Sequence, residues 1–217
     1  DHTITRAIRH HAISYNVYQD QAAVSRAWSL NPLPIMVSAN DWKHIADGLS
    51  QRSMLLNQIL IDAYGKQSLL KEGLLPAALV HAHPGYLRSM YGVTPVNDLY
   101  LPVLAFDIAR GPDGQWWVVS QRCQSPSGLG YMLENRHLIA KLFPQAFKAM
   151  NIQRLADSYR QLVQNLIRLA IPLAQDEAPR LALLTAGPWS ETYFEHAYLA
   201  AYLGLPLVTG SDLIVQG

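Results

Sequence analysis

The sequence predicts an α/β chain, in which a mixed helix-and-hairpin part precedes a strand–helix–strand unit. Apolar residues recur at helical spacing over residues 40–63. A Pro112-Asp113-Gly114 turn separates two strand-like runs, Leu101–Arg110 and Gln115–Cys123. Near the end, the apolar run 181–186 precedes a helical pattern at 191–203. The polar, proline-bounded residues 172–179 lie between the two parts, so the expected domains are 1–171 and 180–217 with a linker at 172–179.

Composition narrows the classes of protein to which the chain can belong. Its 217 residues suit one large domain or two small ones, and 50% are apolar, enough for a sizeable core. A net charge of +1 gives no basic footprint, so we expect no nucleic-acid or membrane partner. The single cysteine, Cys123, cannot form an internal disulfide and suits a reducing, cytoplasmic compartment.

The first part of the chain is expected to hold the longer helices. The helix at about 40–63 has Ser38 as a plausible N-cap and Gly65 as a plausible stop. Alternating residues 13–18 predict a short strand. Further helices are expected at 68–72, 129–142 and 154–170.

The last part reads as a strand, a turn, a helix and a strand. Gly187–Ser190 forms the turn, Ser190 is a possible N-cap, and the helix should stop at Gly204. Short strands are expected at 205–208 and 213–215. This order is typical of the start of a Rossmann-like sheet.

The hairpin carries the first candidate site. Asp107 and Ser120 lie thirteen positions apart, so both can face one site across the paired strands. Asp107 is either a metal ligand or a strand-end residue that bonds the Gly111–Gly114 turn. Ser120, Gln121 and Arg122 form either an anion-binding row or an ordinary polar strand face.

The segment after the hairpin carries the second candidate site. Gly128 and Gly130 have no Cβ, so the backbone of 125–130 can approach a ligand closely. The same glycines suit any turn that leads from a strand into a helix. Arg136, early in the following helix, faces either a pocket or solvent. No Gly-x-Ser-x-Gly elbow and no Gly-x-x-x-x-Gly-Lys-Ser/Thr loop is present, which argues against a serine hydrolase and a P-loop protein.

Two long motifs point to a known family. One is Pro126-Ser127-Gly128 leading into Tyr131-Met132-Leu133-Glu134-Asn135-Arg136. The other is Thr185-Ala186-Gly187-Pro188, then Glu191-Thr192-Tyr193-Phe194-Glu195-His196-Ala197-Tyr198, then Leu203-Gly204-Leu205-Pro206 and Thr209-Gly210-Ser211-Asp212. In this order they resemble the N-terminal portion of circularly permuted ATP-grasp proteins, which are related to glutathionylspermidine synthases.

The resemblance implies an ATP-grasp-like lobe with a metal-binding hairpin, followed by a Rossmann-like pre-ATP-grasp unit. The lobe that clamps ATP from the other side would follow Gly217, so the chain looks like a fragment of a longer protein. The implied reaction is ATP-dependent ligation of a carboxylate to an amine through an acyl phosphate. ATP and Mg²⁺ are the implied cofactors. The implied partners are a small-molecule acid, an amine and the remainder of the chain.

The hairpin departs from the family pattern, in which Asp on strand one faces Glu-Asp-Asn on strand two. Asp107 matches, but the second-strand positions fall on Ser120, Gln121 and Arg122. A guanidinium has no acceptor atom and cannot ligate Mg²⁺, although it can bind phosphate or carboxylate. Asp107 is therefore the expected metal ligand, although Ser120 and Arg122 make metal binding at this site doubtful. The residues expected to bind phosphate are Arg122, Ser127, Gly128 and Arg136. No catalytic residue is assigned.

Two functions remain open from the sequence. The chain is either the N-terminal part of an ATP-dependent carboxylate–amine ligase, inactive alone, or a catalytically inactive ATP-grasp-like binding or scaffold module. In the first case the altered hairpin is rebuilt around an arginine, and in the second it has lost its activity.

Overall fold

The computed structural model describes all residues except 1, 20–21, 175–177 and 215–217. The contacts divide the chain into two compact units, residues 1–35 with 127–217, and residues 36–126. The predicted linker at 172–179 lies inside the first unit. The division into domains 1–171 and 180–217 stays a prediction.

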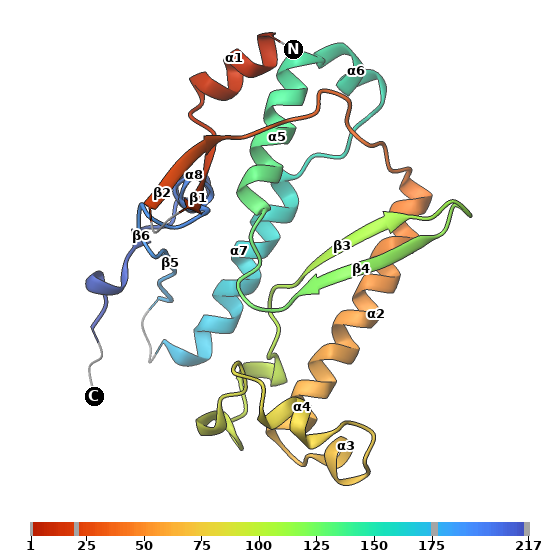
Figure 1. Ribbon diagram of the computed structural model, residues 1–217, viewed down its shortest axis with the longest axis vertical. Coiled ribbons are helices and arrows are strands. Elements are labelled where there is room, and N and C mark those ends of the chain that lie inside the picture. Colours follow the sequence, from red (N-terminus) through yellow and green to blue (C-terminus); the bar gives the residue numbers. More distant parts are fainter. Residues whose placement is uncertain (1, 20–21, 175–177, 215–217) are drawn as a thin grey trace. The chain divides into compact units, whose positions relative to one another are not determined.

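The first unit is built around helix α5 (Leu129–Leu142) (Figure 1). One of its faces packs Tyr131 and Leu138 against Ile8 and Ile13 near the N-terminus. Another packs Leu133 in a second cluster, together with residues of α7 and α8. The remaining elements of this unit are α1 (His2–His10), β1 (Ser14–Gln19), β2 (Ala22–Ala27), α6 (Pro144–Ala149), α7 (Ala156–Ala170), β5 (Leu183–Leu184), α8 (Tyr193–Leu203), β6 (Leu207–Val208) and the 3₁₀ turns Ile171–Leu173 and Gly210–Asp212.

The strands of the first unit form two small pairs. β1 and β2 are antiparallel, and β5 pairs in parallel with β6. Helix α8 connects β5 to β6, as the sequence predicts, but each strand is only two residues long. The strand–helix–strand order is therefore present, and its extension into a Rossmann-like sheet stays a prediction.

The second unit is organised by helix α2 (Ala39–Tyr64), beside which the hairpin of β3 (Ala105–Arg110) and β4 (Trp116–Arg122) lies (Figure 1). Arg52 of α2 donates from Nε to Gln121 Oε1 of β4 at 2.9 Å. Asn57, one turn further along, accepts the backbone N–H groups of Tyr100 and Leu101. These bonds hold the hairpin and the segment that leads into it against one helix. The unit also contains α3 (Ser68–Lys71), α4 (Ala77–His81) and the 3₁₀ turns Arg88–Met90 and Val96–Asp98.

Most predicted helices and caps are confirmed. Ser38 caps α2 by accepting Asp41 N at 3.1 Å, and Gly65 ends the helix. Helix 129–142 has the predicted bounds. In α7 the helix begins two residues later than predicted, at Ala156.

Three predictions about the last part are wrong. Ser190 does not cap α8, which begins at Tyr193 with Thr192 at the N-cap position. The run Leu181–Ala186 pairs only at Leu183–Leu184, where β6 is beside it. Residues 213–214 do not form a strand, because a capping box on Thr209 and Asp212 turns the chain into a 3₁₀ helix at 210–212. Residue 215 lies outside the described residues.

Within the described residues, the longest helices are too polar or too short to cross a bilayer.

Candidate functional site

The hairpin places three of the predicted residues on one face. Asp107 lies directly opposite Ser120, and Ala105 lies opposite Arg122, so both strand-two side chains fall on the face of Asp107. The register shifts by one residue between Asp107 and Ile108. A bulge of this kind increases local twist and re-aims side chains.

The three side chains bond one another. Arg122 Nη2 donates to Asp107 Oδ2 at 2.7 Å, and the Ser120 hydroxyl donates to the same oxygen. The Asp107 side chain is 47% exposed and the Arg122 side chain 53% exposed. Gln121 points to the other face, where it accepts the bond from Arg52. The Asp107 carboxylate therefore does not bond the turn; it is engaged by a cation and a hydroxyl.

These residues do not fit a divalent cation. Mg²⁺ needs several oxygen ligands in octahedral geometry. Oδ2 of Asp107 already accepts two hydrogen bonds, and the guanidinium beside it would repel a metal ion at close range. Among the described residues, no group of three or more His, Cys, Asp or Glu side chains is arranged to hold a metal ion.

Arg122 keeps the donors that an anion needs. A guanidinium has five N–H groups, and Arg122 donates one hydrogen bond to Asp107, from Nη2. The remaining donors can form a bidentate pair with a phosphate or a carboxylate. Because Asp107 fixes the guanidinium from one side, less side-chain freedom is lost when an anion binds.

The Ser127–Gly130 turn lies in the first unit and has a different partner. The backbone N–H groups of Gly128 and Gly130 donate to Glu195 Oε1 at 2.6 and 2.8 Å. Glu195 lies on α8 and is 2% exposed. Sequence reasoning missed this contact, although a single acid between apolar residues of α8 signals a buried and bonded carboxylate.

Arg136 is engaged within α5 and the segment that follows. Its guanidinium lies over the Phe147 ring, 5.6 Å from the centroid. Nη1 also donates to Gln153 O at 3.4 Å. The structure therefore brings Arg136 close to α6 and to neither of the other predicted site residues of its unit, Ser127 and Gly128.

A second buried carboxylate lies on the same helix. Glu134 is 2% exposed, and its Oε1 lies 2.6 Å from His11 Nδ1. Burial, followed by a hydrogen bond to Glu134, raises the pKa of Tyr198 above its ordinary value. Burial, with the charge of Glu195 as a smaller cause, raises the pKa of Tyr131 to about 12. The interior of the first unit is thus acidic and rich in tyrosine.

The turn before α8 is fixed by His196. Its Nδ1 lies 2.9 Å from Thr185 Oγ1, and its Nε2 lies 3.1 Å from Thr192 Oγ1. Thr185 Oγ1 also accepts Gly187 N at 3.1 Å. Both ring nitrogens are therefore bonded inside the fold.

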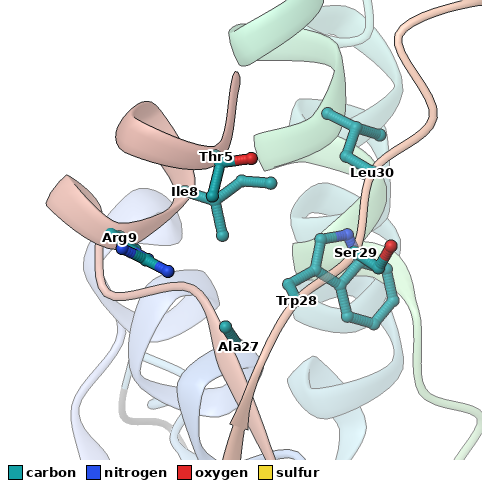
Figure 2. A pocket seen from close by; sticks show the side chains of 7 residues that line it. All are labelled: Thr5, Ile8, Arg9, Ala27, Trp28, Ser29 and Leu30. Atoms are coloured by element: carbon teal, nitrogen blue, oxygen red, sulfur yellow. The ribbon is translucent and has the colours of Figure 1, made fainter. Parts of the chain in front are cut away.

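Two cavities of the first unit are open and lie away from the predicted residues. One, of about 280 Å³, has Thr5 and Arg9 of α1 on one side and Trp28 and Leu30 on the other (Figure 2). The other, of about 270 Å³, lies between Asn16 of β1 and the turn before α8. None of the five predicted site residues lines either cavity.

Comparison with known proteins places the chain in a family. The model of the family described as "Circularly permuted ATP-grasp type 2" matches residues 34–217, which include the whole second unit from α2 onward and the strand–helix–strand segment. "Uncharacterized protein sll0335" of Synechocystis sp. is 35% identical over 204 residues, covering 94% of this chain and 42% of the relative.

Two relatives from Mycobacterium tuberculosis also match most of this chain over a smaller part of their own length. "Uncharacterized protein Rv2567" is 41% identical over 189 residues, covering 87% of this chain and 21% of the relative. "Uncharacterized protein Rv2411c" is 34% identical over 192 residues, covering 88% of this chain and 34% of the relative. The chain thus spans less than half the length of each of these relatives. Since the family model covers most of its residues, the chain belongs to the circularly permuted ATP-grasp type 2 family.

Proposed function

We propose that the chain is part of an ATP-dependent ligase that joins a carboxylate to an amine. The family match supports this proposal, because it runs through the hairpin and the strand–helix–strand segment without interruption. The terminal phosphoryl group of ATP would pass to a carboxylate oxygen, leaving ADP. The amine nitrogen would then attack the acyl carbon and release phosphate. The finer assignment, to ligases like glutathionylspermidine synthase, belongs to this proposal.

The activity is proposed for the whole protein. The relatives are more than twice as long as the part this chain matches, so further residues contribute to their structures. We expect residues 1–217 alone to show no ATP hydrolysis. The acid and the amine are unspecified, since the names of the relatives describe no activity.

In this proposal the hairpin binds an anion through Arg122. Its guanidinium would donate to phosphate oxygens of ATP and supply, at this position, the positive charge that a metal ion supplies elsewhere. The observation that carries this assignment is the Asp107–Arg122 pair on the face shared with Ser120. ATP-grasp proteins typically use Mg²⁺, but no step here is routed through a metal on this hairpin.

Calorimetric titration of the full-length protein with ATP tests the proposal. We expect binding with and without Mg²⁺, because the hairpin brings its own cation. The complete absence of ATP binding under both conditions would contradict the proposal that the protein is an ATP-dependent ligase.

A catalytically inactive binding or scaffold module is the second proposal. The observation that favours this second proposal is the hydrogen bond from Arg122 to Asp107, because Asp107 is the carboxylate to which a metal ion would bind. The double substitution Ser120→Glu with Arg122→Asn in the full-length protein separates the two proposals. ATP turnover that appears only in the double variant marks the native site as inactive. Turnover in the wild type that the double substitution abolishes marks a site rebuilt around arginine.

A further inference from the structure

The start of α5 has the geometry of an anion-binding turn. The first N–H groups of a helix have no partner within the helix and carry partial positive charge. Gly128 immediately precedes the helix, and Gly130 is its second residue. Their N–H groups converge on one oxygen, Glu195 Oε1, at 2.6 and 2.8 Å. Phosphates and carboxylates bind to such turns in other proteins.

The turn is shaped around this carboxylate. A Cβ on Gly130 would lie 2.8 Å from Glu195 Cγ and 3.1 Å from Glu195 O. Gly128 has a φ of +116°, a conformation that strains any residue with a Cβ. Both glycines are therefore needed, one for the close approach of α8 and one for the turn itself.

The second carboxylate oxygen gives an independent observation. Glu195 is 2% exposed, yet its Oε2 has no hydrogen-bond donor among the described residues. The Tyr131 hydroxyl donates to Ser14 O instead, and the Tyr159 hydroxyl donates to Leu129 O. The carboxylate is thus held by one oxygen, through the two glycine amides, as a bound anion would be.

We propose that Gly128 and Gly130 form an anion-binding site for a carboxylate, and that the Glu195 side chain is its built-in occupant. The site is filled from within, so it does not take phosphate or a free carboxylate from solution. A small carboxylate such as acetate can enter only after the Glu195 carboxylate is removed. Of the predicted phosphate contacts, the Arg122 guanidinium therefore stays available. The Gly128 amide does not, because it is already bonded to Glu195.

Replacement of the carboxylate tests the proposal directly. In the full-length protein, Glu195→Ala should lower Tm by roughly 5–10 °C, because the buried Gly130 amide and the partly buried Gly128 amide lose their acceptor. Sodium acetate should restore at least half of this loss, and sodium chloride at the same ionic strength should not. Equal recovery in the two salts would overturn the proposal.

Glu191→Ala is the matched control, because Glu191 is an exposed acid four residues before Glu195. Acetate should not change its Tm relative to chloride. An acetate-specific rise in this control would show that the effect is unrelated to the vacated site.

A milder variant keeps the proposal testable if Glu195→Ala does not fold. Glu195→Gln preserves size and one oxygen acceptor but removes the charge, which weakens bonds from amides. Hydrogen exchange followed by mass spectrometry should show peptides that cover 125–133 exchanging about tenfold faster than in the wild type. Unchanged exchange would contradict a charge-dependent site.

Phosphate distinguishes this inference from the proposed ligase. In the wild type, millimolar phosphate should leave hydrogen exchange at 125–133 unchanged, and protection of these amides by phosphate would overturn the inference. If the full-length protein failed to bind ATP while these amides behaved as expected, that result would count against the proposed ligase alone.

Discussion

Three carboxylates in this chain have three different kinds of hydrogen-bond partner. Asp107 has a guanidinium at the surface, Glu134 has an imidazole in the interior, and Glu195 has two backbone amides. The energetic consequences differ because solvent screens the exposed Asp107–Arg122 pair, whereas Glu134 and Glu195 are each 2% exposed. A carboxylate's effect on stability therefore depends on its burial, and its availability to a ligand depends on its partner.

Arg122→Ala should have little effect on stability. Both side chains of the Asp107 pair are about half exposed, so we expect the free energy of unfolding to fall by about 0.2–1 kcal/mol. Urea denaturation measures this. A loss several times larger would indicate that the pair supports the hairpin fold rather than a binding face.

His11→Ala should be more costly. It leaves the buried Glu134 carboxylate without its imidazole partner, and we expect a loss of about 1–3 kcal/mol in the free energy of unfolding. The control is His10→Ala, which removes the exposed neighbour and should change stability by less than about 0.5 kcal/mol. Equal losses in the two variants would show that Glu134 does not depend on His11.

At the scale of elements, helices were easier to predict from the sequence than strands. The α2 pattern and its Ser38 cap lie within one segment, so local residues decide them. Helix α1 and strand β2 were missed, because β2 is stabilised by pairing with β1 and α1 by packing onto α5. The strand predicted at 181–186 is longer than the observed β5, because the sequence does not reveal how short its partner β6 is.

The same distinction applies to the candidate site. The common face of Asp107, Ser120 and Arg122 follows from the hairpin register and could be predicted. The bond from Gly128 to Glu195 joins residues 67 positions apart on different elements. Nothing in the local sequence of either residue specifies that contact, so only the packing of α8 against α5 reveals it.

Two glycine substitutions in helices should have opposite effects. Gly48→Ala lies in an exposed part of α2 with nothing within 4 Å of the new Cβ, and should stabilise by about 0.5–1 kcal/mol. Gly130→Ala brings Cβ to 2.8 Å from Glu195 Cγ and close to its backbone, and should destabilise by about 1–3 kcal/mol. Thermal denaturation of both variants checks this, and stabilisation by Gly130→Ala would contradict the close packing of α5 on α8.

At the scale of the whole molecule, the acidic, tyrosine-rich interior of the first unit should make the protein less stable as the pH rises into the alkaline range. Burial raises the pKa of Tyr131 and of Tyr159 to about 12, above the ordinary value of 10.0. The folded state therefore holds these protons more tightly than the unfolded state. Their contribution to stability is complete below pH 10 and is lost as the pH rises towards about 12.

Tyr159→Phe tests this dependence. Each such group adds a slope of up to about 1.4 kcal/mol per pH unit in this window, so the variant should show a shallower loss of stability than the wild type. Urea denaturation between about pH 10 and about pH 12 measures the slope. Tyr91→Phe, at a 55% exposed tyrosine, is the control and should leave the slope unchanged.

The most direct test of the central claim is the ATP affinity of the full-length protein with and without the Arg122 side chain. Calorimetry should show ATP binding to the wild type that weakens at least roughly tenfold in Arg122→Ala, as expected for loss of a charge-assisted bidentate contact. Arg110→Ala, on the same hairpin, is the control and should bind ATP as the wild type does. Equal ATP affinity in wild type and Arg122→Ala would contradict the assignment of this hairpin face to the nucleotide.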